Sequence, residues 1–105
     1  MWFGEAIKLA LIQNLRLNKK FMVFGQGVNS KNYGLKDKAP KQVLEMPISE
    51  VGFTGMAVGL ASQGFRPFVH HIRTEFALLV LDQILTHASR WNYNLGEKYK
   101  CPISL

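Results

Sequence analysis

Stretches with helical apolar spacing alternate with short apolar runs along this chain, and no other feature of the sequence constrains the fold as much. The short runs are bounded by glycine, proline or polar residues, which is typical of buried strands. We expect helices at 2–17, 49–63 and 74–91, and strands at 21–24, 43–46, 66–72 and from 101 onward. This order predicts an α/β fold in which helices flank a parallel sheet.

Two of these segments carry further expectations. The helix at 74–91 is apolar around most of its circumference, so we expect it to be buried on more than one side. The segment 25–42 is rich in glycine, asparagine and lysine, and we expect a long loop. Because the chain ends where its last strand begins, we expect residues 1–105 to form one domain that is a truncated part of a larger one.

Composition favours a folded chain and excludes several functional classes. Hydrophobic residues make up 48% of the 105 residues, yet no apolar run reaches the ~18–20 residues that span a bilayer. The single cysteine, Cys101, allows no internal disulfide, which fits a reducing compartment. The net charge of +6 comes largely from lysines without interleaved arginines. A solvated basic face is therefore favoured, and we expect neither nucleic acid nor a membrane as partner.

The start of the second expected helix combines several unusual residues. Pro47 stiffens the approach, Ser49 suits the N-cap position, and Glu50 falls in the first turn. Glycines follow that would give this helix a smooth face or end it: Gly52, Gly55, Gly59 and Gly64. Glu50 is either an ordinary first-turn acid, worth ~0.3–1 kcal/mol, or a carboxylate held to bond a ligand nitrogen. Local spacing alone favours the ordinary acid.

Other polar residues give weaker signals. His70 and His71 are neighbours in an expected strand, so their side chains should point to opposite faces and cannot readily share one metal. Gly25-Gln26-Gly27 does not continue into a phosphate-binding fingerprint. We find no spacing typical of a metal site or of a nucleophile–base pair.

A longer pattern resembles the pyrimidine-binding domain of thiamine diphosphate enzymes. Its residues are Met46-Pro47-Ile48-Ser49-Glu50, then Gly64-Phe65-Arg66-Pro67, then Phe76 and Asp82-Gln83-Ile84. The resemblance covers nearly the whole chain and is strongest to the beta subunit of the 2-oxoacid dehydrogenase decarboxylating component. Transketolase and deoxyxylulose-phosphate synthase share a looser version of the pattern.

The resemblance implies a role for four residues in this chain. Glu50 would hydrogen-bond a ring nitrogen of the cofactor pyrimidine and so help to activate thiamine diphosphate. Phe76 would pack against the pyrimidine, although it could instead be a plain core residue, and Ile48 would lie near the ring. The backbone carbonyl of Ile103 would help to hold a potassium ion.

The resemblance also implies a partner. An alpha-type subunit would supply the site for the diphosphate and its magnesium ion, so the chain would work in a hetero-oligomer, or self-associate, and would be inactive alone. The implied activity is oxidative decarboxylation of a 2-keto acid. Transketolase-like ketol transfer and a non-catalytic structural or interaction role remain alternatives. The expected location is the cytoplasm, or the mitochondrial matrix in a eukaryote.

One departure from the family pattern concerns the residues after the first strand. Beta subunits often read Gly-Glu-Asp-Val there, whereas this chain has Gly25-Gln26-Gly27-Val28. A carboxylate is therefore lost at this position.

Overall fold

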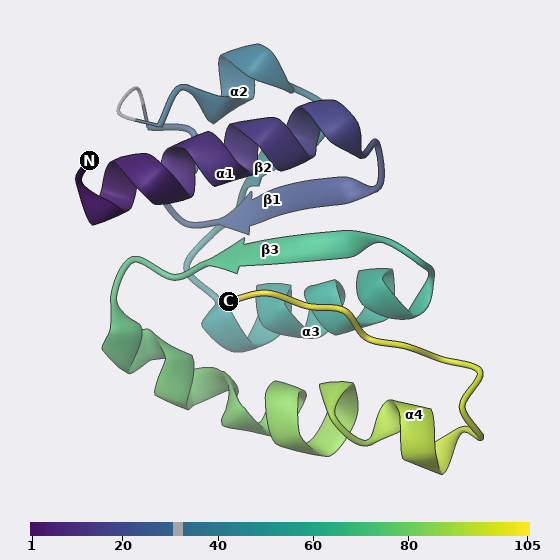
Figure 1. The fold of residues 1–105 in the computed structure, drawn as a ribbon. Helices are drawn as coiled ribbons and strands as arrows, with labels where there is room; N and C mark the ends of the chain where they lie inside the picture. Colours follow the sequence, from purple (N-terminus) through teal and green to yellow (C-terminus); the bar gives the residue numbers. More distant parts are fainter. Residues whose placement is uncertain (31–32) are drawn as a thin grey trace.

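The computed structural model, which describes residues 1–30 and 33–105, is an α/β fold built on a parallel sheet (Figure 1). Three strands lie in the order β2-β1-β3. Their bounds are Phe21–Gly25 for β1, Val43–Glu45 for β2 and Arg66–His70 for β3. The α/β class and the parallel sheet predicted from the alternating pattern are confirmed. Two residues of the lysine-rich segment, Lys31 and Asn32, lie outside the described residues.

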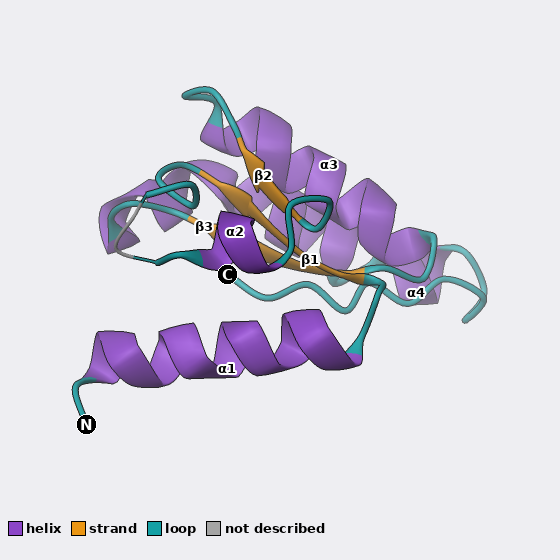
Figure 2. Ribbon diagram, turned by 90° about the horizontal axis from the view of Figure 1, so that it is seen from above, coloured by secondary structure: helices purple, strands orange, loops and turns teal. Residues whose placement is uncertain are grey.

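Helices cover both faces of the sheet. On one face lie α1 (Phe3–Leu17) and the short α2 (Leu35–Lys38), and on the other lies α3 (Glu50–Ser62) (Figure 1). Seen from above, α2 lies over the sheet while α1 runs beside it (Figure 2). None of the helices formed by the described residues is long and apolar enough to cross a membrane.

The core consists of two apolar clusters, one on each side of the sheet. Strand β1 contributes side chains to both clusters: Phe21 and Val23 point toward α1 and α2, whereas Phe24 points toward α3. The cluster under α1 and α2 also contains Leu11, Leu15, Val28, Leu35 and Val43. The cluster under α3 contains Phe53, Ala57 and Val69 in addition to Phe24. Burial on both faces is typical of a parallel sheet.

The segment 74–91 departs from the predicted single helix. It forms a 3₁₀ helix, η1 (Thr74–Val80), then a π-helix, η2 (Gln83–Ala88), and the chain continues into α4 (Trp91–Asn94). The predicted burial on more than one side is wrong, because Val80 is the one buried residue of η1 and η2. Four large side chains of this segment are exposed by 45–68%: Leu78, Leu79, Leu81 and Leu85.

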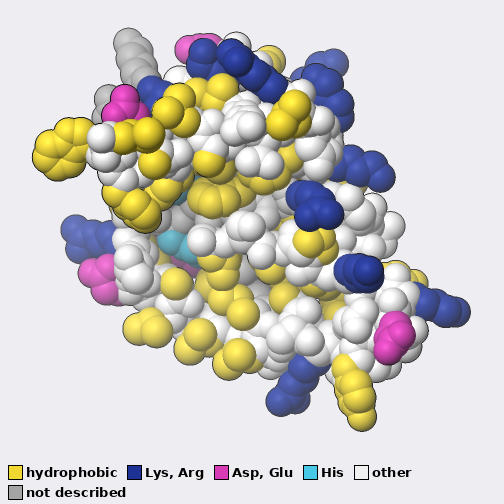
Figure 3. All heavy atoms as spheres, in the orientation of Figure 1, with side chains coloured by type: hydrophobic (Ala, Val, Ile, Leu, Met, Phe, Trp, Pro, Cys, Tyr) yellow, Lys and Arg dark blue, Asp and Glu magenta, His cyan; other side chains and the backbone are white. Residues whose placement is uncertain are grey.

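The leucines of segment 74–91 are exposed because few elements of the fold pack against this segment. Among the described elements, α3 packs against both η1 and η2 while α4 contacts η2 alone, and the four leucines stay exposed. Hydrophobic side chains consequently gather along this lower part of the molecule in Figure 3. An apolar pattern in sequence cannot distinguish a side chain packed inside the domain from one left uncovered.

Smaller differences concern the ends of elements. The segment expected to be a loop contains α2, which is anchored by the buried side chain of Leu35. The strand expected at 66–72 ends at His70, and the strand expected from 101 consists of a single bridge between Ser104 and Phe68. One buried leucine has no periodicity, which explains why sequence patterns missed α2.

Candidate functional site

The carboxyl ends of the three strands meet at one edge of the sheet, at the left of Figure 1. The connection after β1 leaves toward the face that carries α2, whereas the connection after β3 leaves toward the face that carries α3 and η1. Neighbouring parallel strands whose connections diverge in this way leave a crevice that ligands commonly occupy. The residues that follow the strands are therefore candidate site residues.

Glu50 lies at this edge as the first residue of α3. Its side chain is half-buried, and its Oε1 accepts a hydrogen bond from Nε2 of Gln26 at 3.4 Å. Among the described residues no partner bonds Oε2. The carboxylate is thus held from one side and leaves one oxygen free for a ligand.

Ser49 takes the predicted N-cap position of α3 but does not act as the predicted cap. Its side chain makes no capping hydrogen bond. Its hydroxyl instead lies over the next turn, where a Cβ added to Gly52 would come within 2.6 Å of Oγ. Gly52 therefore makes room for this serine, rather than providing a smooth face for another backbone.

Gln26 is fixed by the end of β3. Its backbone N–H donates to the carbonyl of His70 at 3.3 Å, and Nδ1–H of His70 donates to the Gln26 carbonyl at 2.6 Å. That leaves Nε2 of His70 to accept a hydrogen bond from the Tyr33 hydroxyl at 3.4 Å. Gln26 is only 6% exposed. The donor to Glu50 thus comes from a residue with little freedom to move.

Glu45, at the end of β2, holds the turn that follows β1. Its two carboxylate oxygens accept hydrogen bonds from the backbone N–H groups of Gly27 at 2.6 Å and Asn29 at 2.8 Å. Hydrogen bonds to an ionised acceptor are among the stronger ones in proteins. Sequence analysis missed this residue, although an acid at the end of a strand opposite a glycine-rich turn was the available signal.

His71 lies on the opposite side of β3 from His70, as predicted. Its ring packs against Phe53 at a centroid distance of 5.3 Å, and its Nε2 lies 3.5 Å from Oγ1 of Thr54. Burial lowers the pKa of His71, an effect that the nearby Glu50 carboxylate opposes and His70 reinforces. His71 is therefore neutral at pH 7 and does not form an ion pair with Glu50.

The other predicted site residues are more scattered. Ile48, in the approach to α3, is 86% exposed, and Phe76 is half-buried on η1. Ile103 packs against the core cluster under α3, next to the bridge at Ser104 rather than at the carboxyl edge. The roles of these three residues stay predictions. Within residues 1–30 and 33–105, no group of three His, Cys, Asp or Glu side chains could hold a metal ion.

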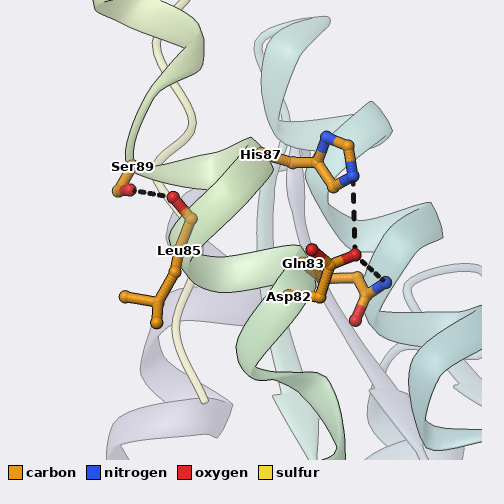
Figure 4. A network of polar contacts seen from close by, with 5 residues as sticks. All are labelled: Asp82, Gln83, Leu85, His87 and Ser89. Atoms are coloured by element: carbon orange, nitrogen blue, oxygen red, sulfur yellow. Dashed lines mark hydrogen bonds and ion pairs between the residues drawn. The ribbon is translucent and has the colours of Figure 1, made fainter.

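The predicted Asp82-Gln83 pair forms a separate polar cluster on η2 (Figure 4). Oδ2 of Asp82 lies 3.9 Å from Nε2 of His87 and accepts from Nε2 of Gln83 at 3.5 Å. The wider turn of the π-helix brings residues five apart onto one face, so Asp82 meets His87. Cγ of Gln83 lies 3.8 Å from the Cβ position of Gly55, so this glycine borders η2. The cluster therefore borders α3 through Gln83, and none of its hydrogen bonds or ion pairs involves Glu50.

Comparison with known proteins gives a consistent result. The family model described as transketolase, pyrimidine binding domain, matches residues 1–105. The pyruvate dehydrogenase E1 component subunit beta of Rickettsia conorii is 36% identical over 94% of this chain and 32% of its own length. The mitochondrial subunit beta-2 of Oryza sativa subsp. japonica is 36% identical over 98% of this chain and 29% of its own length. The chain thus spans about a third of these curated relatives.

Proposed function

Because the chain belongs to the transketolase pyrimidine-binding domain family, we propose that it is a beta-subunit-like part of a thiamine diphosphate-dependent 2-oxoacid dehydrogenase. The observation that carries the proposal is the position of Glu50. Its carboxylate lies at the carboxyl edge of the sheet, is held by Gln26, and keeps one oxygen free. The pyruvate dehydrogenase E1 beta subunits among the relatives support the reaction class.

The residues around Glu50 suit the aminopyrimidine ring of the cofactor. The side chains of Ile48 and Val51, on either side of Glu50 in sequence, are both exposed and offer apolar surface to a flat ring. The free oxygen of Glu50 can hydrogen-bond a ring nitrogen. Since His71 is neutral, no neighbouring histidinium competes for the carboxylate. The aminopyrimidine ring therefore fits the residues around Glu50.

Each residue has a limited task in this proposal. Thiamine diphosphate, when bound, supplies the carbon nucleophile that attacks the keto group of a 2-keto acid. Glu50 would hydrogen-bond the ring nitrogen and hold or accept a proton there, while Gln26 keeps the carboxylate in position. Ile48 and Phe76 would contact the ring, and the carbonyl of Ile103, which lies away from the carboxyl edge, would contribute to a separate potassium site.

The proposal requires a second subunit. An alpha-type partner would hold the diphosphate and its magnesium ion, so that the complete cofactor site lies between two subunits. The chain would then act in a hetero-oligomer and have no turnover alone.

Calorimetry on the chain purified with an alpha-type partner tests the proposal. Thiamine diphosphate with magnesium is titrated into the complex, and 2-keto acid decarboxylation is measured alongside. We expect Glu50→Gln to weaken cofactor binding and to lower turnover about 10²–10⁴-fold, the usual contribution of a proton-transfer group. Its thermal unfolding should stay close to that of the unchanged chain.

Glu5→Gln is the matched control, because Glu5 also lies in the first turn of a helix, α1. It removes the same charge on the opposite face of the sheet from α3 and should leave binding and turnover unchanged. Cofactor binding that is insensitive to Glu50→Gln, or lost equally in both variants, would overturn the proposal.

A further inference from the structure

A hollow of about 690 Å³ opens at the amino ends of the strands, on the opposite side of the sheet from the Glu50 edge. We call it the lysine-rimmed hollow, after Lys19, Lys38 and Lys41, which line it. The remaining lining residues are mostly apolar: Met22, Ala39, Pro40, Gln42, Leu60 and Phe65. Its volume lies within the roughly 300–1,000 Å³ typical of small-molecule sites.

Hydrogen bonds hold the walls of this hollow in place. Nε2 of Gln42 donates to the carbonyls of Asn18 at 3.0 Å and Phe21 at 2.7 Å. It thereby ties the segment that carries Lys38 and Lys41 to the turn that carries Lys19. Preformed walls reduce the ordering cost of binding.

A fourth lysine, Lys36, stabilises the backbone of the rim through hydrogen bonds. Nζ of Lys36 donates to the carbonyls of Pro40 at 2.8 Å and Val43 at 2.7 Å. This bond pair closes the turn before β2 and fixes the backbone on which Lys38 and Lys41 are mounted.

The charge of the hollow is uncompensated. None of the described residues that line it is acidic. Within the described part of the chain, Lys19, Lys38 and Lys41 have no ion pair or hydrogen bond that uses their ammonium groups. Lys and Arg side chains gather over the upper and right-hand parts of the molecule in Figure 3. Charges of one sign around a concave, apolar surface raise the local concentration of anions.

We propose that the lysine-rimmed hollow binds an organic phosphate with an apolar body. Three ammonium groups can each contact one oxygen of a phosphate, and lysine binds phosphate as a point charge without the flat fork that arginine offers to carboxylates. The apolar body lies against Leu60, Phe65 and Met22. This site is separate from the Glu50 edge and does not depend on the function proposed for it.

Octyl phosphate below its micelle concentration is a suitable probe for the full 105-residue chain. Binding is measured by calorimetry and by methionine methyl NMR. The methyl signal of Met22 in the hollow should shift and saturate, whereas that of the exposed Met56 on α3 should not. We expect octyl phosphate to bind at least tenfold more tightly than inorganic phosphate or 1-octanol, because each of these lacks one half of the ligand.

Variants that change the charge of the hollow test whether the lysines bind the phosphate group of octyl phosphate. Lys38→Glu with Lys41→Glu should weaken octyl phosphate at least tenfold, and Lys38→Gln with Lys41→Gln should weaken it less. Lys98→Glu with Lys100→Glu makes the same charge change outside the hollow and should have little effect. Equal weakening by both glutamate pairs, 1-octanol binding as tightly as octyl phosphate, or an unshifted Met22 methyl would each overturn the proposal.

Discussion

Replacing Gly25 by alanine tests how closely β1 and β3 must approach at the candidate site. Gly25 has a φ of +141°, in the range that favours glycine. A Cβ added there would overlap the carbonyl oxygen of His70 and come within 2.9 Å of its carbonyl carbon and amide nitrogen. All three atoms are backbone, so no flexible side chain can move aside. The strands would have to separate at the edge that holds Gln26.

The cost has two parts. Backbone strain in such a region costs about 1–3 kcal/mol. Separation also weakens the hydrogen bond from Gln26 N–H to the His70 carbonyl, now 3.3 Å, which is worth about 1 kcal/mol. Gly25→Ala should therefore destabilise the chain by about 2–4 kcal/mol, a large share of the total stability of a small domain.

Gly27→Ala is the matched control. Gly27 also has a positive φ, +73°, but no atom lies within 4 Å of its Cβ position. Gly27→Ala should be destabilised only by the left-handed backbone conformation of the new alanine, which costs about 1–2 kcal/mol. Urea unfolding followed by circular dichroism at 222 nm measures both. If Gly25→Ala is no more destabilising than Gly27→Ala, close approach of the two strands is not what requires Gly25.

Two further predictions concern charge and exposed surface. The pKa of His71 is lowered from 6.5 in the folded chain, so on acidification the His71 ring is protonated in the unfolded chain before it is protonated in the folded one. The unfolding free energy should therefore fall as the pH drops below about 6.5. His71→Phe should flatten this dependence in urea titrations between pH 5 and 7.5, and an unchanged slope would contradict it. The exposed leucines of η1 and η2 should cause self-association, so Leu78→Gln with Leu85→Gln should shift sedimentation velocity profiles toward monomer. Leu17 on α1 is exposed even more than Leu78 and Leu85, yet Leu17→Gln should not have this effect, and a concentration-independent monomer of the unchanged chain would refute the argument.

The local parts of the site followed from sequence, whereas its long-range contacts did not. The position of Glu50 in the first turn of a helix could be predicted from residues within a few positions of it, although Ser49 makes no capping hydrogen bond. Its bond to Gln26 joins residues 24 apart in the chain and depends on the neighbouring positions of β1 and α3. The sequence showed only that a carboxylate expected after β1 was absent, without showing that its replacement would donate to Glu50.

The same distinction explains the segment 74–91. The prediction of burial on more than one side was wrong, because burial needs a second layer, and among the described elements α3 packs against both η1 and η2 while α4 contacts η2 alone. The type of helix was also not predictable. The 3₁₀, α and π forms place residues three, four and five apart over one another, but a segment that is apolar around most of its circumference is compatible with each of these spacings.

The exchange of a carboxylate for Gln26 bears directly on how Glu50 can work. Two carboxylates as close as Gln26 and Glu50 would repel one another or share a proton. An amide instead presents its N–H to Glu50 and fixes one oxygen, at 3.4 Å. The backbone of Gln26 is locked to His70, and the turn that follows is held by Glu45, so the donor stays in place. In the function proposed above, the departure from the family pattern orients the carboxylate without a second negative charge beside it, and it leaves Oε2 of Glu50, which no described residue bonds, available for a ring nitrogen.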